Sequence, residues 1–404
     1  MLGFTAVEFF IVSVFIFAVL YWLFPRKLSI IPMLILTFLL ALLAYKAVPN
    51  VSDDLSRYFM QLDYLREYGM DYLQKCFREK INNWDVYRVT GYYFYYMSKF
   101  KSNKMLPAVT VFIVYTLMFT VIYRIAMRLR INKVYLFGAC MFFISTYWYY
   151  ELYSGIRNAL TFAIIFACGY FHIVEKRFIP LCFVGYGLAC FMHSTGTMFV
   201  AVVLIAWVSM YINSKSFNYL LILGLAGGNV LIQFLARFTH NKLILSLAGQ
   251  AEENTSEMGF NIGTKFLVNI SVLLVVGLMI YYFSYYINQN HYIGSKRFAM
   301  QTRLYKYFMV IVYFMLGSIV SSMVFHRLAR WVLPVIGAII FMIGMQSQRN
   351  EINDKGEHYL SYEAPRKQMR RMRIRSTVII GFIAYTAVHF WYLCTGSSLV
   401  WMHS

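Results

Sequence analysis

The chain has 404 residues, of which 60% are hydrophobic and 13% are charged, and its mean hydropathy is +0.58. Together with repeated apolar runs of about 20 residues, this composition excludes a water-soluble domain, because a soluble fold cannot bury so much apolar surface. The net charge of +20 does not indicate nucleic-acid binding, because the basic residues interrupt the hydrophobic runs instead of covering one soluble face.

About twelve hydrophobic segments are predicted to cross a membrane as helices, because backbone groups in hydrocarbon must bond within their own segment. In chain order they are residues 4–24, 28–48, 105–126, 134–152, 156–175, 178–193, 196–212, 217–236, 264–286, 304–325, 328–346 and 376–395. We therefore expect an all-α polytopic integral membrane protein, with residues 1–404 forming a single transmembrane domain. The cysteines form no CxxC pair, so we expect neither a disulfide nor a metal site.

The basic loops predict the orientation of these helices. Loops 25–27, 124–133, 287–306 and 347–375 are rich in Lys and Arg, and the last contains the run RKQMRRMRIR. They all fall on one side if the N-terminus is outside, and the positive-inside rule makes that side cytoplasmic. Both termini are then predicted to face outward. No basic region precedes the first hydrophobic run, so we expect it to remain as a helix and not to be cleaved as a signal peptide.

The longest external segment, residues 49–104, begins with the stretch NVSDDLSRYFMQLDYL, in which Asp53, Asp54 and Arg57 lie close together. Its first half is predicted to form an amphipathic helix on the membrane or on the bundle. The apolar positions at helical spacing are Leu55, Tyr58, Phe59, Leu62 and Leu65. The second half is strongly aromatic, includes Arg88 and could re-enter the outer leaflet. Asp53 and Asp54 have a simpler alternative, which is to cap the helix that follows them.

Other polar residues are predicted to lie on the same outer face. Arg157 begins the segment 156–175, His193 lies in the turn of CFMHSTGT, and Arg327 and Arg330 lie in FHRLARW. Outward helix N-termini present unpaired amides, and a guanidinium can bond an anion through two parallel hydrogen bonds. This face is therefore predicted to bind a phosphate or a carboxylate.

Each of these residues also has a structural interpretation. His193 could be a turn histidine bonded to the backbone, and Arg327 and Arg330 could extend their charges to the membrane surface. The aromatic residues of the outer face could form an ordinary interfacial belt or a platform that stacks sugar rings. Those considered for sugar binding are Tyr149, Tyr150, Tyr153 and Trp331.

These motifs resemble the EpsG-type family of polysaccharide polymerases, which is similar to the Wzy polymerases of O-antigen and capsule. The resemblance rests on the Asp-x-x-x-Arg-Tyr run from Asp53 to Tyr58, on SGIRNALTFAI with Arg157, on FMHSTGTMF with His193, and on HRLARW. It extends loosely over most of the chain. One departure is Trp84-Asp85-Val86, where the family would have an acidic residue followed by proline.

The resemblance implies a GT-C-like glycosyltransferase bundle in the bacterial cytoplasmic membrane, with its active site on the outer face. The implied substrate is an oligosaccharide repeat unit on undecaprenyl pyrophosphate, joined to others without a metal or a cofactor. Arg157 and Arg327 are expected to bind the pyrophosphate, with Arg330, Arg57 and Arg88 as supporting cations. His193, Asp54 or Asp53 is the expected base. The implied partners are membrane lipids and a chain-length regulator, with no nucleic acid.

Two other classes of function remain open from the sequence. A transporter or flippase of lipid-linked oligosaccharides should have polar groups along both halves of a path. An acyltransferase that modifies polysaccharide on the outer face should need a route for an acyl donor from the cytoplasm. The gathering of charged motifs on one face favours a one-sided site over a path.

Overall fold

The structure is a computed structural model that describes residues 5–49, 53–147, 149–212, 296–317 and 322–358, with the isolated positions 238, 245, 274, 277, 381, 383–391 and 394. The described residues form helices and turns, without a strand among them, as predicted for an all-α protein. The predicted segments 217–236 and 264–286 lie outside these residues, as does most of 376–395. The count of about twelve spans therefore stays a prediction.

Four helical segments of the described chain are long and apolar enough to cross a membrane. They are α1 (Ala6–Leu23), α2 (Ile30–Tyr45) with the short helix η1 (Arg26–Leu28), α5 (Met105–Arg128), and α8 (Ile156–Gly169) continued by the π-helix η3 (Tyr170–Glu175). Shorter apolar helices are α6 (Lys133–Thr146), α9 (Ile179–Cys190) and α10 (Ser194–Ser209). The remaining helices of the bundle are α7 (Tyr149–Ser154), α15 (Lys296–Gly317), α16 (Ser322–Trp331) and α17 (Leu333–His358).

Some boundaries differ from the predicted ones. The segment predicted as 134–152 ends as α6 at Thr146, because Tyr147 adopts an extended conformation, and α7 follows as a separate short helix. The segment predicted as 328–346 is divided between α16 and α17, and Pro334 stands in the first turn of α17, where its missing N–H has no helical partner to lose. Helix α17 also continues through residues 347–358, which we expected to begin the basic loop.

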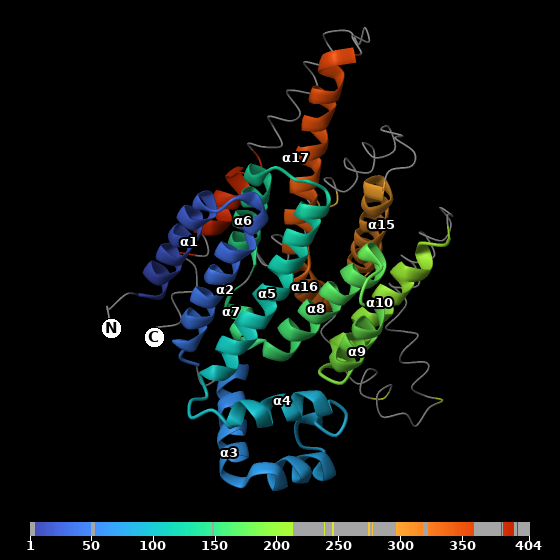
Figure 1. Ribbon diagram of the computed structural model, residues 1–404. Helices are drawn as coiled ribbons and strands as arrows, with labels where there is room; N and C mark the ends of the chain where they lie inside the picture. The colour runs from blue at the N-terminus through green and yellow to red at the C-terminus, as the bar shows by residue number, and fades with distance from the viewer. Residues whose placement is uncertain are drawn as a thin grey trace.

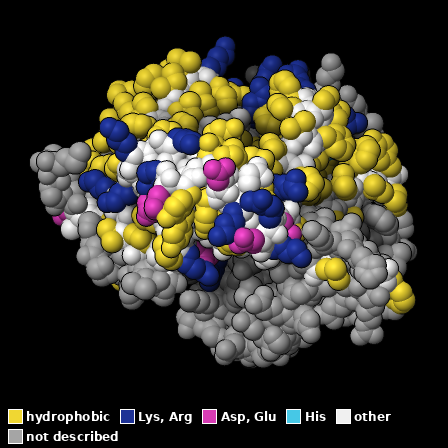
Figure 2. Space-filling view, turned by 90° about the horizontal axis from the view of Figure 1, so that it is seen from below, with side chains coloured by type: hydrophobic (Ala, Val, Ile, Leu, Met, Phe, Trp, Pro, Cys, Tyr) yellow, Lys and Arg dark blue, Asp and Glu magenta, His cyan; other side chains and the backbone are white. Residues whose placement is uncertain are grey.

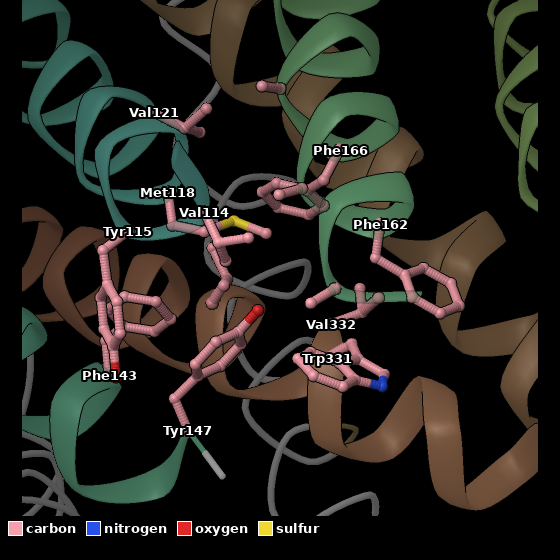
Figure 3. Close-up of a cluster of buried hydrophobic side chains, with 14 of the residues drawn as sticks. Val114, Tyr115, Met118, Val121, Phe143, Tyr147, Phe162, Phe166, Trp331 and Val332 are labelled. Carbon is pink, nitrogen blue, oxygen red and sulfur yellow. The ribbon is translucent and has the colours of Figure 1, made fainter. Parts of the chain in front are cut away.

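The centre of the bundle is filled with apolar side chains. Helix α5 packs against α2 and α8, α6 packs against α17, and α10 packs between α8 and α15 (Figure 1). Figure 3 shows how side chains of α5, α6 and α8 meet those at the junction of α16 and α17. The buried residues labelled there include Met118, Phe143, Phe162, Phe166 and Trp331. Among the described residues, a layer of mostly apolar side chains therefore lies between the two ends of the bundle.

One end of the bundle collects the basic loops. Arg26 Nη1 donates a hydrogen bond to the carbonyl of Ile131 at 2.9 Å, and Lys133 Nζ donates one to the carbonyl of Phe24 at 2.6 Å. Arg303 Nε donates to the carbonyl of Val174 at the end of η3, and the last turns of α17 extend at the same end (Figure 1). We call this the basic end. Loops predicted to share one side of a membrane thus share one end of the protein.

The opposite end carries a separate layer made by α3 (Asp54–Glu79), η2 (Ile81–Asn83) and α4 (Arg88–Ser98), which lies beneath the bundle in Figure 1. The predicted amphipathic helix is confirmed, because α3 buries Leu55, Tyr58, Leu62 and Leu65. Gly69 adopts a φ of +64°, which divides α3 into two segments at a residue that tolerates this conformation. Seen from below in Figure 2, the layer displays Lys, Arg, Asp and Glu side chains, a surface suited to water or lipid headgroups.

Candidate functional site

The N-terminus of α8 meets the α3–α4 layer through Arg157. The Nε of Arg157 donates a hydrogen bond to the hydroxyl of Tyr58 at 3.2 Å, and its guanidinium carbon lies 5.6 Å from the centroid of the Tyr58 ring. The residues are 99 positions apart in the chain. Two of the motifs singled out in the sequence, the DDLSRY run and the SGIRNAL segment, are therefore in direct contact.

The surroundings of Arg157 suit an anion. Gly155 occupies the N-cap position of α8 and makes no side-chain capping bond there, and a helix N-terminus favours negative charge. Among the ion pairs of the described residues, none includes Arg157. A half-buried guanidinium held by a tyrosine, beside a helix N-terminus, is an arrangement that a phosphate could complete.

Asp54 and Arg57 lie on the first turn of α3, next to Tyr58. They form an ion pair with each other, and their side chains remain 43% and 66% exposed, so a solute could reach both. Asp53 stands at the N-cap position of α3, but its side chain makes no capping hydrogen bond, and its backbone carbonyl accepts one from the hydroxyl of Ser56. The capping interpretation of the two aspartates therefore has no side-chain bond to support it.

His193 is the N-cap residue of α10, and it is buried. Its Nδ1 accepts a hydrogen bond from the backbone N–H of Thr195 at 3.3 Å and lies 2.9 Å from the Thr195 hydroxyl. That hydroxyl donates to Oδ1 of Asn158, the residue after Arg157, at 3.0 Å. The ring of Tyr87 stacks on the imidazole at 6.0 Å. An Nδ1 that accepts an amide hydrogen leaves the neutral imidazole protonated at Nε2.

Hydrogen bonds fix the turn before His193 against the α3–α4 layer. The backbone N–H of Val89 donates to the carbonyl of Phe191, and the hydroxyl of Thr90 donates to the carbonyl of Met192 at 2.5 Å. Gly196 allows α10 to approach α9, because a Cβ at this position would lie 2.2 Å from the carbonyl oxygen of Ala189. His193, Arg157 and the outer layer therefore belong to one connected region.

The predicted sugar-stacking residues lie elsewhere. Tyr149 and Tyr153 are buried, and the hydroxyl of Tyr149 donates to the carbonyl of Leu40 in α2. Trp331 is buried against Tyr147, with ring centroids 5.7 Å apart (Figure 3). These three rings pack in the core and are not brought together with Arg157. The side chain of Tyr150 lies outside the described residues.

The remaining predicted cations are dispersed. Arg88 is the first residue of α4, exposed, with its guanidinium 5.6 Å from the ring of Phe77. Arg330 is half-buried on α16, a helix that contacts α8. The side chain of Arg327 lies outside the described residues. Of the predicted cations, Arg57 is adjacent in the sequence to Tyr58, the residue that contacts Arg157.

Sequence reasoning missed several residues of this region. Tyr58 was assigned to the apolar face of α3 and to the Asp-x-x-x-Arg-Tyr motif but not as a partner of Arg157, and Asn158 and Thr195 were not considered, although they stand inside the motifs of Arg157 and His193. It also missed a cluster of three tyrosine rings on α3, two before and one after the break at Gly69. These are Tyr64, Tyr68 and Tyr72, of which the first two are 45% and 54% exposed.

Comparisons of the chain with protein-family models, with curated proteins and with solved structures found no match. Within the described part of the chain, no group of three or more His, Cys, Asp and Glu residues is arranged to hold a metal ion. The function of this site therefore has to be inferred from its own residues.

Proposed function

We propose that the chain is a polysaccharide polymerase that joins lipid-pyrophosphate-linked oligosaccharide repeat units on the outer face of a bacterial cytoplasmic membrane. The observation that carries the proposal is Arg157, which belongs to none of the ion pairs of the described residues and lies at the N-terminus of α8, where it contacts the α3–α4 layer through Tyr58. The motif resemblance supplies the substrate class, and the region around Arg157 supplies groups that suit its pyrophosphate.

The reaction requires one bond to form and one to break. A sugar hydroxyl of one repeat unit attacks the anomeric carbon of the other glycan, the bond from that carbon to the pyrophosphate oxygen breaks, and the lipid pyrophosphate leaves. The hydroxyl proton passes to a base. Negative charge grows on the leaving pyrophosphate, and Arg157 and the N-terminus of α8 are placed to stabilise it, with Arg57 as a supporting cation once it turns from Asp54.

Of the three proposed bases, His193, Asp54 and Asp53, we favour Asp54. Its carboxylate is accessible and only one helical turn from Tyr58, and its partner Arg57 could turn to a bound pyrophosphate. His193 is buried, and its Nδ1 already serves as the acceptor for α10. A base must have a free lone pair within reach of the proton that it takes. We therefore assign His193 a positioning role, which links the start of α10 to Asn158 on α8.

The two alternative classes fit less well. A transporter would need polar groups through the middle of the bundle, where the described helices instead pack apolar side chains such as Phe162 and Phe166 (Figure 3). An acyltransferase would need a path for an acyl donor through the same layer. A one-sided site needs neither.

The decisive test is incubation of the purified protein, in lipid nanodiscs, with the lipid-linked repeat unit isolated from cells that carry this chain. We expect a ladder of longer glycans and the release of free lipid pyrophosphate. Recovery of intact substrate moved across a liposome membrane would instead identify a transporter. Addition of an acyl group to the glycan would identify an acyltransferase.

A further inference from the structure

The basic end contains a cavity of about 540 Å³ between η3, α9, α10 and α15. This volume falls in the range of sites that hold small ligands. Its polar lining includes His172, Lys176, Arg303 and Lys306, and among the described residues no Asp or Glu belongs to the lining. The cavity therefore combines ligand size with a concentration of positive charge.

Glu175, the acidic residue next to the cavity in the sequence, already has two arginine partners. Glu175 directly precedes Lys176, but its carboxylate pairs with Arg124 at 2.7 Å and lies 3.8 Å from Arg128. Among the ion pairs of the described residues, none includes Lys176, Lys306 or Arg303. Arg303 gives its Nε–H to the carbonyl of Val174, which leaves the remaining N–H groups of its guanidinium for another acceptor. The positive charges of the cavity therefore have no carboxylate counter-charge among the described residues, and an anion could supply one.

An exposed apolar surface continues from the cavity along α9. Ile179 and Phe183 line the cavity and are also 40% and 47% exposed. Farther along α9 the exposed side chains are Leu181, Val184, Leu188 and Phe191. Trp207 and Tyr211 also line the cavity and are 37% and 72% exposed, and these residue types concentrate at the level of lipid headgroups. An anion with attached hydrocarbon fits both parts of this surface.

We propose that this cavity binds the phosphate of an anionic phospholipid, whose acyl chains lie along α9. The site is distinct from that of Arg157, because the two are separated by the length of α8 and η3, roughly 25 to 30 Å for a helix of this length. The proposal stands whether or not the chain is a polymerase, and it assigns the basic end a lipid of the surrounding membrane.

The binding test uses native mass spectrometry of the purified protein with phosphatidylglycerol and phosphatidylcholine. We expect phosphatidylglycerol to bind more tightly. Lys176→Gln or Lys306→Gln should weaken its binding roughly fivefold and the double variant roughly 25-fold, as expected for the loss of one and two surface cations. The control is Lys101→Gln, which removes the same charge from an exposed position at the opposite end and should leave binding unchanged.

The position of the lipid can be tested separately. Phosphatidylglycerol with brominated acyl chains should quench the fluorescence of Trp207, and the quenched component should disappear in Trp207→Phe. Equal binding of both lipids, equal loss in Lys101→Gln, or quenching that persists in Trp207→Phe would overturn the proposal. Competition by inorganic phosphate at the lipid's own concentration would show that the cavity takes a soluble phosphate and would overturn the assignment to a lipid.

Discussion

Arginine side chains at the two ends of the bundle have different kinds of partner, a charged carboxylate at one end and a neutral tyrosine at the other. At the basic end, Arg124 and Arg128 surround Glu175, whose side chain is only 2% exposed. Arg124 donates from Nε and Nη2 to the two carboxylate oxygens at 3.1 and 2.7 Å, and the hydroxyl of Tyr170 donates to the same carboxylate. At the other end, Arg157 contacts the hydroxyl and the aromatic face of Tyr58, and it belongs to none of the ion pairs found among the described residues.

This difference separates two uses of the same side chain. A guanidinium paired with a buried carboxylate has its charge compensated, and removal of either partner leaves an uncompensated charge that destabilises the fold. A guanidinium held by a tyrosine keeps most of its donors and its charge for a ligand. We therefore expect changes near Arg157 to alter the rate of reaction, and changes near Glu175 to alter stability.

The largest effect is expected for Asp54→Asn. Asparagine keeps the size of the side chain but cannot accept the proton of the acceptor hydroxyl. We expect polymerisation to slow roughly 10²- to 10⁴-fold, with little change in unfolding temperature. The product ladder assay measures the rate. The control is Asp71→Asn, which removes an exposed carboxylate from the second segment of α3 and should retain full activity. Equal activity in both variants would remove Asp54 as the base.

Arg157→Lys should have the next largest effect, although it keeps the positive charge. Lysine cannot form the two parallel hydrogen bonds that a guanidinium offers to a phosphate. We expect turnover to fall about 10²-fold, close to the loss in Arg157→Ala, because a donor that stabilises developing charge contributes about 3 kcal/mol.

The amount of Arg157→Lys protein in the membrane must be measured beside its activity, because poor folding would give the same loss. Arg78→Lys, at an exposed position near the end of α3, is the matched control. Normal polymer from well-expressed Arg157→Ala would refute the pyrophosphate assignment and the contrast between the two ends.

Glu175→Gln tests the basic end. Glutamine would leave Arg124 and Arg128 without their counter-charge, and loss of one partner of a fully buried pair costs about 3 to 5 kcal/mol. The two arginines are 31% and 41% exposed, so water should reduce the cost to about 2 kcal/mol. We expect a lower unfolding temperature and an unchanged rate per folded molecule.

The control for Glu175→Gln is Glu79→Gln. Glu79 lies 4.0 Å from Lys75 in an exposed pair, and pairs of this kind contribute little. Its unfolding temperature should match that of the unchanged protein. A rate loss in Glu175→Gln without loss of stability would show that the basic end takes part in the reaction.

Part of this arrangement could be predicted from the sequence. The period of apolar residues located the amphipathic first segment of α3, and the placement of Lys and Arg predicted which loops share one end, because both depend on local pattern alone. The break between α6 and α7 could not be predicted, since one long apolar run has the same composition as a helix, a turn and a second helix.

Contacts between side chains of distant segments could not be predicted from the sequence either, for a different reason. Tyr58 and Tyr149 are both tyrosines near the predicted outer surface, but one contacts Arg157 and the other donates to the carbonyl of Leu40. An amphipathic ring suits either an interface or a core, so its neighbours decide its position. Those neighbours come from distant segments whose packing no local pattern contains.

Substitution of His193 should change stability and reaction rate less than the substitutions above. The two measurements together distinguish a structural role of His193 from a chemical one. Asparagine is among the best N-cap residues, whereas alanine cannot cap, so His193→Ala should lose about 1 kcal/mol of stability and His193→Asn should lose little. If Asp54 is the base, His193→Asn should keep its rate within about tenfold. Thermal unfolding and the ladder assay are measured on both variants. A stable but inactive His193→Asn would transfer the role of base to the imidazole.

The smallest effect is expected at Tyr147, in the apolar layer that divides the two ends. Its ring packs 4.8 Å from Phe143, and its buried hydroxyl has no hydrogen-bond partner among the described residues. A buried hydroxyl without a partner is unfavourable, so Tyr147→Phe should leave stability unchanged or raise it by up to about 1 kcal/mol.

Tyr149→Phe is the matched comparison, because that hydroxyl donates to Leu40 and its loss should destabilise by about 0.5 to 1.5 kcal/mol. Unfolding temperatures in one detergent give both values. Equal destabilisation would mean that the Tyr147 hydroxyl has a polar partner, and the apolar layer on which we base a one-sided site would then be interrupted.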